Sequence, residues 1–378
     1  MRIVVMGVGR IGGAIARDLV RSGAGQITAV DLSADALAPL AGEGIQIHRA
    51  DLADRARVAA IAAEHDLVIG AGPASLGFAT LKTVVDAGRN VVDISFFAED
   101  PFALDELARE RGVVAVVDAG VSPGLSNVLY GNAVASLGSV RRFVCYVGGL
   151  PAHPHGPMSY KAPFAPSDVI ELYTRPARHV RDSVPRTDPA LSLRVEMAFP
   201  NAGMLEAALT DGLRTMLRET DVSEMREMTL RYPGHFDQIL LLRDLGFFDS
   251  SPVALGGQDV SPRAVTEHVL RSHWAFTPGE ADVTLLQVEI DVDACGDTKR
   301  YVHHMIDRYD RATDTSSMAR TTGHTCTAIA SLVASGRYAQ VGVSAPEDVG
   351  RTPGCCQLIL SYLAERGVAV DVWEETIA

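Results

Sequence analysis

Basic residues and cysteines are scarce in this sequence of 378 residues. Its 34 Lys and Arg stand against 47 Asp and Glu, which gives a formal net charge of −13. A protein that binds nucleic acid or an anionic membrane surface needs a basic face, so we expect neither partner. The five cysteines show neither metal-ligand spacing nor a disulfide framework, which predicts reduced thiols. They are Cys145, Cys295, Cys326, Cys355 and Cys356.

Long apolar runs, a signal-peptide pattern and metal-binding clusters are also missing. No apolar segment approaches the length of a membrane span. An apolar run at 2–6 follows Met1 almost at once, so we expect no signal peptide and a cytoplasmic protein. His153-Pro154-His155 offers only two ligands without a neighbouring carboxylate or cysteine, so we expect no metal. We expect the pair His303-His304 on the surface of a strand.

The first 31 residues contain a strand, a glycine turn, a helix, a second strand and an acid. The apolar run 2–6 leads into Gly7-Val8-Gly9-Arg10-Ile11-Gly12, and a helical pattern continues to Arg21. A second strand pattern at 26–30 is closed by Asp31. This order is the fingerprint of a dinucleotide-binding βαβ unit. The alternative is a Rossmann-like unit that binds S-adenosylmethionine or no ligand.

Each part of this unit has a physical role toward a dinucleotide. Gly7 permits the tight turn, Gly9 lets the backbone approach the pyrophosphate, and Gly12 lets helix and strand pack closely. The pyrophosphate would bind at the helix start, where Arg10 and Ile11 lie. Asp31 lies 19 residues beyond the last glycine, where a carboxylate accepts both adenosine ribose hydroxyls and repels a 2′-phosphate. We therefore predict that NAD is favoured over NADP.

Strand and helix patterns keep alternating to residue 117, which predicts an α/β fold with a doubly wound parallel Rossmann sheet. Ligands bind at the carboxyl ends of such strands. Asp51 follows the third strand and could contact adenine or cap a helix. Gly70, Gly72 and Pro73 follow the fourth strand, and we expect them beside the nicotinamide ribose.

The second half of the chain mixes strands and helices without a βαβ rhythm. It predicts strands at 141–149, 228–232 and 283–292, and helices at 206–218 and 236–245. We therefore expect an inserted α+β domain with an antiparallel sheet, whose outer face would support a homodimer or a higher homo-oligomer. The predicted domains are 1–125 for the cofactor, 126–318 for substrate and dimerisation, and 319–378 as a segment that returns to the Rossmann domain.

Five short motifs follow one another along the chain. They are Gly7-Val8-Gly9-Arg10-Ile11-Gly12, Asp118-Ala119-Gly120-Val121-Ser122-Pro123-Gly124, Tyr146-Val147-Gly148-Gly149-Leu150-Pro151, Thr229-Leu230-Arg231-Tyr232-Pro233-Gly234-His235 and Met318-Ala319-Arg320-Thr321-Thr322. With these motifs the sequence resembles the saccharopine dehydrogenase superfamily over nearly its full length, most closely its L-lysine 6-dehydrogenase-like branch. Ser122 and Val147 stand where saccharopine-forming reductases typically carry aspartate and cysteine, whereas Ser159-Tyr160-Lys161 resembles the reductases.

The resemblance implies an NAD-dependent oxidoreductase that acts on the CH–NH2 group of an amino acid. Its leading form is oxidative deamination of L-lysine at the ε-carbon to 2-aminoadipate semialdehyde, which closes to piperideine-6-carboxylate. One alternative is a reductase that joins an amine to a carbonyl compound, as saccharopine or carboxynorspermidine dehydrogenases do. A second alternative is a non-catalytic sensor that binds NAD.

An amino-acid substrate calls for an arginine, whose planar fork binds a carboxylate at two points. Arg231 is the first candidate, with Arg214 and Arg320 as alternates, although each could instead make a surface ion pair. The predicted substrate-binding set is completed by Tyr232, Lys161 and Thr322.

Amine deprotonation and imine hydrolysis need a group that exchanges a proton near neutral pH. His235 fits by its ordinary pKa, but it could also cap the helix predicted to follow it. Asp93 and Asp118 end the fifth and sixth strands, where each could act as the base, hold a substrate amine or close a turn.

Overall fold

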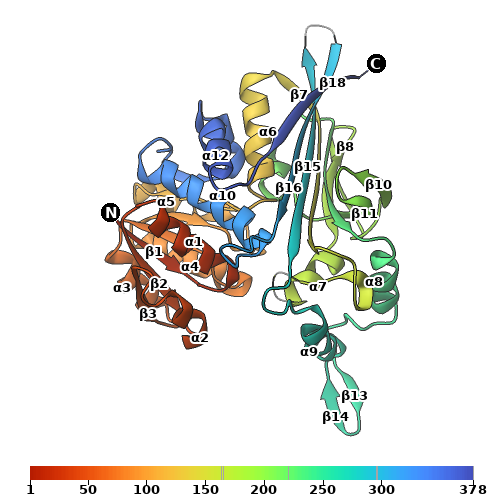
Figure 1. The fold of residues 1–378 in the computed structure, drawn as a ribbon, viewed down its shortest axis with the longest axis horizontal. Coiled ribbons are helices and arrows are strands. Elements are labelled where there is room, and N and C mark those ends of the chain that lie inside the picture. Colours follow the sequence, from red (N-terminus) through yellow and green to blue (C-terminus); the bar gives the residue numbers. More distant parts are fainter. Residues whose placement is uncertain (163, 165, 220, 295–296, 378) are drawn as a thin grey trace. The chain divides into compact units, whose positions relative to one another are not determined.

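The computed structural model describes residues 1–162, 164, 166–219, 221–294 and 297–377 (Figure 1). The chain forms two compact units, and neither is one continuous stretch of sequence. The first unit comprises Met1–Gly138 and Ala319–Ala369, and the second comprises Ser139–Met318 and Val370–Ala378.

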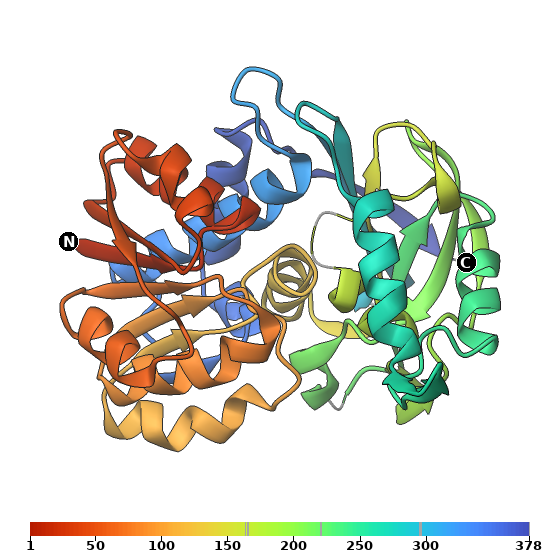
Figure 2. The same ribbon diagram turned by 90° about the horizontal axis from the view of Figure 1, so that it is seen from below.

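The first unit is built on a parallel sheet. In the described part of the chain it has seven strands in the order β17-β6-β5-β4-β1-β2-β3. They are β1 (Arg2–Met6), β2 (Gln26–Asp31), β3 (Ile45–Arg49), β4 (Leu67–Gly70), β5 (Asn90–Asp93), β6 (Val114–Val116) and β17 (Gly342–Ser344). Figures 1 and 2 show helices along both faces. The predicted α/β fold with a doubly wound Rossmann sheet is confirmed.

Helices alternate with these strands. They are α1 (Arg10–Arg21), α2 (Ala34–Leu37), α3 (Arg55–Ala63), α4 (Ala74–Asp86), α5 (Asp105–Glu110), α6 (Leu125–Ser136), α10 (Ser317–Ala334), α11 (Pro346–Arg351) and α12 (Cys355–Ala364), with 3-10 turns at Ala38–Leu40 and Pro101–Leu104. Val4, Val5 and Met6 of β1 have no exposed surface because helices cover both sides of the sheet. Burying each such side chain stabilises the fold by about 1.5–3 kcal/mol.

The first unit extends beyond the predicted boundary at residue 125 because α6 packs closely on α11. A Cβ built on Gly131 of α6 would lie 2.0 Å from the carbonyl oxygen of Glu347, and one built on Gly350 would lie 2.1 Å from that of Val128. Only glycine permits this approach of two helix backbones. Helix α6 therefore belongs to the Rossmann unit.

Asp18 of α1 is the buried centre of a polar cluster in the first unit. Its carboxylate accepts hydrogen bonds from the Tyr362 hydroxyl at 2.8 Å, Arg366 Nε at 2.6 Å and the Thr327 hydroxyl at 2.5 Å, and His324 Nδ1 lies 3.5 Å away. Burial raises the pKa of Asp18, but the hydrogen bonds and nearby positive charge outweigh it and hold the pKa well below its ordinary 3.8. The cluster joins α1 to α10 and α12.

Replacing Asp18 with asparagine should lower the free energy of unfolding by about 2–4 kcal/mol at pH 7, because a buried ion pair loses one charge. Because folding lowers the pKa of Asp18, its carboxylate contributes its full stabilisation at pH values above the ordinary pKa. This stabilisation is lost as the pH falls from the ordinary pKa toward the lowered one. The difference from the unmodified chain should therefore shrink below about pH 4. Urea unfolding at several pH values measures it, with exposed Glu110→Gln as the control. A difference that stays constant down to pH 3 would contradict the stabilising role of the charge.

The second unit is an α+β domain built on a mixed sheet. In the described residues it has nine strands. Seven of them lie in the order β10-β11-β12-β7-β15-β16-β18, and the other two extend from β12, with β8 paired to β12 and β9 paired to β8. They are β7 (Ser139–Pro151), β8 (Ala177–Arg181), β9 (Val184–Asp188), β10 (Val195–Phe199), β11 (Gly203–Thr210), β12 (Glu224–Arg231), β15 (Asp282–Ala294), β16 (Asp297–Arg308) and β18 (Asp371–Ile377). Neighbouring strands of this sheet pair antiparallel in the described residues, except β12 and β7, which are parallel.

The remaining elements of the second unit are helices and one small hairpin. They are α7 (Pro166–Thr174), α8 (His235–Asp244), α9 (Pro262–Trp274), short 3-10 turns at Pro157–Ser159 and Arg214–Arg218, and the hairpin β13 (Val253–Leu255) with β14 (Gln258–Val260). The core of this unit contains large aromatic side chains from the helices, including Tyr173, Phe236 and Trp274.

Three expectations about local structure were wrong. The predicted helix at 206–218 is instead the end of β11 followed by a 3-10 turn, because residues 206–210 pair with β12 and this pairing overrides their helix propensity. His303 and His304 do lie on a strand, but they are buried rather than at the surface, with 9% and 6% exposure. The segment 319–378 returns to the first unit only as far as residue 369, since β18 pairs with β16.

The cysteines of the described residues form no disulfide bond. Cys145, Cys326, Cys355 and Cys356 are free and buried, and Cys295 lies outside the described residues. Within those described residues we find no helix with the length and apolar character of a membrane span, and no group of three or more potential metal ligands.

Candidate functional site

The glycine turn after β1 has the geometry that its sequence predicts. Gly7 has a φ of +92°, and a Cβ there would lie 2.5 Å from the carbonyl oxygen of Ala71, which follows β4. A Cβ on Gly12 would lie 1.9 Å from the carbonyl oxygen of Gly7. These two glycines therefore allow the turn, the helix and the exit of β4 to pack together.

Gly9 differs from Gly7 and Gly12 because a Cβ on Gly9 would meet no atom within 4 Å. It forms the N-cap of α1 without a side-chain hydrogen bond, and the first turn of α1, which begins with Arg10 and Ile11, carries no acidic residue. The start of this helix is therefore open to an anion, where its N–H groups and dipole favour a phosphate. These residues fit a dinucleotide.

Asp31 at the end of β2 is held in place by two backbone groups. Its carboxylate accepts hydrogen bonds from Val8 N–H at 2.9 Å and Ser33 N–H at 2.8 Å. Arg49 is its parallel partner on β3, and the Nε of this exposed arginine donates to the Leu32 carbonyl at 2.9 Å. Sequence reasoning missed Arg49 because it considered only the residues directly after Asp31. The parallel register of β2 and β3 is the signal that would have revealed it.

The predicted residues after β4 and β5 lie close together in the first unit. A Cβ on Gly70 would overlap Asp93, whose Oδ2 lies 1.8 Å from that position. Asp93 is buried and its Oδ1 accepts Ser95 N–H at 2.7 Å, so it has the turn geometry that the sequence left open. Gly72 lies near Gly7, and Pro73 is the N-cap of α4.

The other predicted residues of the first unit are more scattered. Asp118 is buried with a φ of +53° and follows β6 after one residue. Asp51 is exposed and accepts Ala53 N–H at 2.9 Å, whereas Asp54 caps α3. Thr322 lies beside Gly120, and Arg320 Nη2 donates to the carbonyl of Arg366 at 2.9 Å. Arg320 and Thr322 thus belong to the Rossmann unit and not to the unit that holds Arg231.

Arg231 ends β12 as the centre of an aromatic cluster, here called the Arg231 cluster, formed by Arg231, Tyr160, Tyr173 and His235. Its Nε donates to the Tyr173 hydroxyl at 2.7 Å, Nη1 to the Leu230 carbonyl at 2.7 Å and Nη2 to the Tyr160 hydroxyl at 3.4 Å. The guanidinium carbon lies 4.5 Å from the centre of the Tyr160 ring. It is the only Arg or Lys among the described residues that is buried, and within them no carboxylate lies within 4 Å of it.

Hydrogen bonds in the Arg231 cluster fix the proton on His235. Tyr173 accepts a hydrogen bond from Arg231, so its own hydroxyl donates to His235 Nε2 at 2.9 Å, and Nδ1–H donates to the Met158 carbonyl at 3.0 Å. Desolvation by burial and the charge of Arg231 lower the pKa of His235 to about 3. The ordinary pKa assumed for His235 is therefore wrong for this site. The imidazole is neutral at neutral pH and orients Tyr173.

Glu227 is a buried carboxyl that sequence reasoning missed. It lies on the same face of β12 as Arg231, because side chains four residues apart on a strand point the same way. Thr210 donates to its carboxyl group at 2.5 Å, and Gly212 leaves room for it, since a Cβ there would lie 2.4 Å from the carboxyl carbon. Burial raises the pKa of Glu227 to about 7. The pKa of Glu227 therefore lies closer to neutral pH than that of His235.

The remaining predicted substrate residues of the second unit have different surroundings. Arg214 begins a 3-10 turn with a φ of +49°. Lys161 Nζ donates to the Ala275 carbonyl at 2.9 Å and lies 3.8 Å from Glu280. The Tyr232 hydroxyl donates to the Pro151 carbonyl at 2.9 Å, and its ring lines a cavity to which the Arg231 cluster does not contribute.

The parallel sheet with its glycine turn, joined to an α+β unit, places this chain among two-domain Rossmann-type dinucleotide-binding proteins. Two family models confirm this class. The Saccharopine dehydrogenase NADP binding domain matches residues 3–116, and the Saccharopine dehydrogenase C-terminal domain matches residues 120–368. The chain therefore belongs to the saccharopine dehydrogenase family. The first of these descriptions names NADP, so the family assignment supports a nicotinamide cofactor without the predicted restriction to NAD.

Individual relatives agree with this assignment. An alpha-aminoadipic semialdehyde synthase of Arabidopsis thaliana is 25% identical over 252 residues, covering 60% of this chain and 23% of its own length. A saccharopine dehydrogenase [NADP(+), L-glutamate-forming] of Pyricularia oryzae is 24% identical over 245 residues, covering 62% and 54%. The chain thus spans about half or less of these relatives. The apo saccharopine dehydrogenase (L-Glu forming) of Saccharomyces cerevisiae has the same fold, with a TM-score of 0.79, 18% identity and full coverage of both chains.

Proposed function

We propose that this protein is a nicotinamide-dependent oxidoreductase that acts on the C–N bond of an amino acid, with L-lysine as its leading substrate. The observation that carries the proposal is Arg231, a buried cation without a carboxylate within 4 Å among the described residues. Arginine has five N–H donors, and Arg231 makes three hydrogen bonds, so two N–H groups remain for a substrate carboxylate. A buried guanidinium that binds a carboxylate gains a direct ion pair, in addition to the longer-range attraction that Arg231 has to Glu227.

The number of buried cations supports a substrate with one carboxylate. Lysine carries a single carboxylate, whereas saccharopine carries three. In the described residues of the second unit, Arg178 is paired with Asp211 and Arg194 is paired with Glu206 and Asp237. Among the residues of this unit that the structure describes, Arg231 alone combines burial with spare donors, which favours the smaller amino acid.

The proposed reaction converts L-lysine, water and oxidised cofactor into 2-aminoadipate semialdehyde, ammonium, reduced cofactor and a proton. The bound nicotinamide supplies the hydride acceptor. The residues after β1, with Gly9 at the start of α1, would hold the dinucleotide, and Asp31 would hold its adenosine ribose. Arg231 binds the substrate carboxylate, while Tyr173 and neutral His235 fix the orientation of its guanidinium. Asp93 and Asp118 remain the predicted candidates for the base.

A saccharopine-type C–N dehydrogenase is the second candidate. It is supported by the names of the relatives in Pyricularia oryzae and Saccharomyces cerevisiae, which are saccharopine dehydrogenases. Such an enzyme would oxidise a secondary amine and release glutamate rather than ammonium. The released product therefore separates the two candidates.

The test is the formation of reduced cofactor, followed by absorbance, with the full chain and either NAD or NADP. Substrates are L-lysine, saccharopine, L-ornithine and 1,5-diaminopentane, with ammonium and glutamate measured in parallel. Turnover of lysine with stoichiometric ammonium supports the leading proposal. Turnover of saccharopine alone, with glutamate released, would replace it by the second candidate. Cofactor binding without turnover of any amine would refute both and favour a sensor.

Cofactor choice gives a separate prediction at Asp31 and Arg49. We propose that NAD is preferred, because the carboxylate of Asp31 repels a 2′-phosphate, while Arg49 provides a cation beside it. Asp31→Ser should lower kcat/KM for NAD by about tenfold or more and raise it for NADP. Arg49→Gln should weaken NADP and leave NAD unchanged. The opposite preference, for NADP, would be shown by Asp31→Ser if this variant kept nearly all of its activity with NAD.

A further inference from the structure

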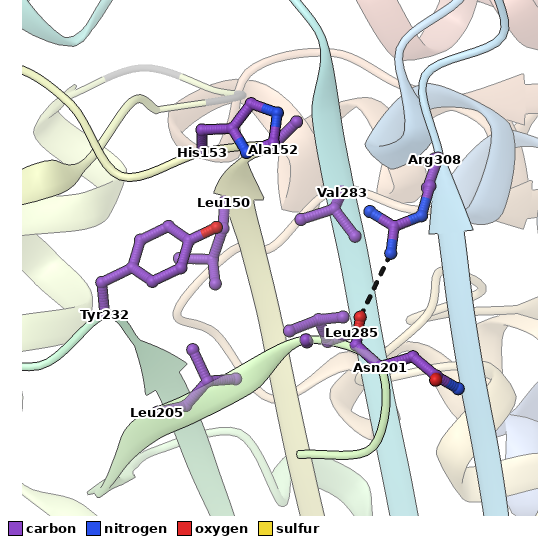
Figure 3. A pocket seen from close by; sticks show the side chains of 10 residues that line it. Leu150, Ala152, His153, Asn201, Leu205, Tyr232, Val283, Leu285 and Arg308 are labelled. Carbon is purple, nitrogen blue, oxygen red and sulfur yellow. Dashed lines mark hydrogen bonds between the residues drawn. The ribbon is translucent and has the colours of Figure 1, made fainter. Parts of the chain in front are cut away.

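Exposed apolar side chains of the second unit gather in one segment of its chain. The cavity in Figure 3 is not part of this surface, because the apolar side chains that line it, such as Leu150 and Val283, are at most 3% exposed. Seven of the 19 large apolar side chains that are exposed among the described residues lie between 241 and 269. They are Leu241 and Leu245 of α8, Phe247, Val253 and Leu255 of β13, and Val265 and Val269 of α9.

The hairpin of β13 and β14 lies in the middle of this segment. Figure 1 shows it beyond the end of α9, away from the mixed sheet. In the described residues its two strands pair only with each other, with Ala254 opposite Asp259 and Leu255 opposite Gln258. All three residues of β13 are exposed, Val253 to 51% and Leu255 to 67%. A two-stranded hairpin of this size gains little stability from its own pairing, so further strands would stabilise it.

The turn of the hairpin determines which backbone groups of β13 face the open edge. Gly256 and Gly257 have φ values of +60° and +84°, as in the type I′ turn of a two-residue hairpin loop. The residues next to such a turn, here Leu255 and Gln258, exchange hydrogen bonds, and the following pair does not. The N–H and the carbonyl of Ala254 therefore point away from β14.

The edge of β13 lacks the features that usually keep exposed strands apart. Its residues 253–255 include neither a charged residue nor a proline, the residue types that protect an edge. Among the strands that the structure describes, every other exposed edge strand carries at least one charged residue. They are β3 with Arg49, β9 with Arg186 and Asp188, β10 with Glu196, β14 with Asp259, and β18 with Asp371, Glu374 and Glu375. Strand β13 is therefore the exposed edge that another strand can join without meeting a charge.

We propose that two copies of this chain associate by pairing their β13 strands antiparallel, with Ala254 opposite Ala254 of the second copy. The outward N–H and carbonyl of each Ala254 would exchange two hydrogen bonds across a twofold axis, and the two hairpins would form one four-stranded sheet. This register brings Val253 of each copy opposite Leu255 of the other, so the neighbouring cross-strand pairs are apolar. The proposal does not depend on the proposed reaction.

The same self-pairing is unfavourable at the other edges of this unit. Two β14 strands in the same arrangement would bring Asp259 opposite Asp259, and two β18 strands would bring their acidic residues together. On β13 itself, Pro252 offers no N–H at the next outward position, so the backbone contribution centres on Ala254. Apolar contacts supply the rest, and Val265 and Val269 of α9 extend the apolar surface of the same segment.

The test is sedimentation equilibrium of the full chain between about 1 and 100 µM, a range that covers weak dimers. The measured mass should rise with concentration to an even multiple of the mass of one chain. Ala254→Lys places two like charges opposite each other and should raise the dissociation constant by about tenfold or more, so that the mass falls by half. A chain that remains monomeric at the highest concentration overturns the proposal.

Two further variants separate strand pairing from folding. Ala254→Pro removes the outward N–H without removing a hydrogen bond to β14, so it should weaken the association as Ala254→Lys does. Ala254→Ser keeps this N–H, adds no charge and should leave the mass unchanged. All three variants should unfold in urea at the midpoint of the unmodified chain, because Ala254 is exposed. If the chain is oligomeric but keeps its mass in both Ala254→Lys and Ala254→Pro, it associates through another surface and the proposal is overturned.

Discussion

Replacing Arg231 with glutamine should lower kcat/KM for L-lysine by about a thousandfold, since two charge-assisted hydrogen bonds to the substrate carboxylate are worth about 1.5–3 kcal/mol each. The loss should depend on that carboxylate. 1,5-Diaminopentane is lysine without its carboxylate, so its kcat/KM should change little in Arg231→Gln. The ratio of the two substrates then measures the contact of Arg231 with the carboxylate and cancels general effects on the enzyme.

The matched control for Arg231→Gln is Arg186→Gln, which removes an exposed arginine of β9 in the same unit. It should leave both substrates unaffected. Tyr173→Phe tests the orientation of Arg231, because this variant keeps the ring but removes the hydroxyl that links Arg231 to His235. This variant should raise KM for lysine more than it lowers kcat. If Arg231→Gln preserves the preference for lysine over the diamine, Arg231 does not bind the carboxylate.

Substitution by alanine should reduce stability at one glycine of the motif and cofactor binding at another. Gly12→Ala should lower the free energy of unfolding by about 3 kcal/mol, because its Cβ would lie 1.9 Å from the Gly7 carbonyl oxygen and the helix must move away. Gly9→Ala should change the free energy of unfolding by less than about 1 kcal/mol, because its Cβ meets no atom within 4 Å. Its methyl group instead enters the space where a pyrophosphate would bind.

Dinucleotide binding separates these two roles. Gly9→Ala should weaken NAD binding by about tenfold or more, measured by calorimetry on a protein whose urea unfolding is unchanged. Gly12→Ala should show an early unfolding midpoint even without cofactor. A Gly9→Ala chain that binds NAD normally would show that the backbone at this position does not approach the cofactor.

The sequence alone predicted the elements whose signals are local. The run 2–6, the glycine turn and the alternation of strands with helices depend on neighbouring residues, and the Rossmann sheet follows from them. The segment 206–218 shows the limit of such reasoning. Its Leu205-Glu206-Ala207-Ala208-Leu209 core has good helix formers, yet it lies between β10 and β12, and the pairing with both strands decides its structure.

Properties that depend on distant partners were beyond sequence reasoning. Arg231 was predicted as a substrate residue, but its burial between Tyr160 and Tyr173 depends on elements about 60 and 70 residues earlier. Burial lowers the pKa of His235 and raises that of Glu227, so the residue types alone did not indicate which of the two groups has a pKa near neutral pH. Arg49 was missed for a related reason, since only strand register places it beside Asp31.

The division of the chain into interleaved units has a consequence for its synthesis. The Rossmann sheet receives its edge strand β17 only after the whole stretch 139–318 has been translated, and the mixed sheet receives β18 after that. Until β17 arrives, β6 presents an unpaired edge, and until β18 arrives, β16 does the same, which exposes both to pairing with other nascent chains. The two units therefore cannot be completed one after the other in the order of the sequence, and a fragment cut at residue 138 would contain neither a finished Rossmann domain nor a protected sheet edge.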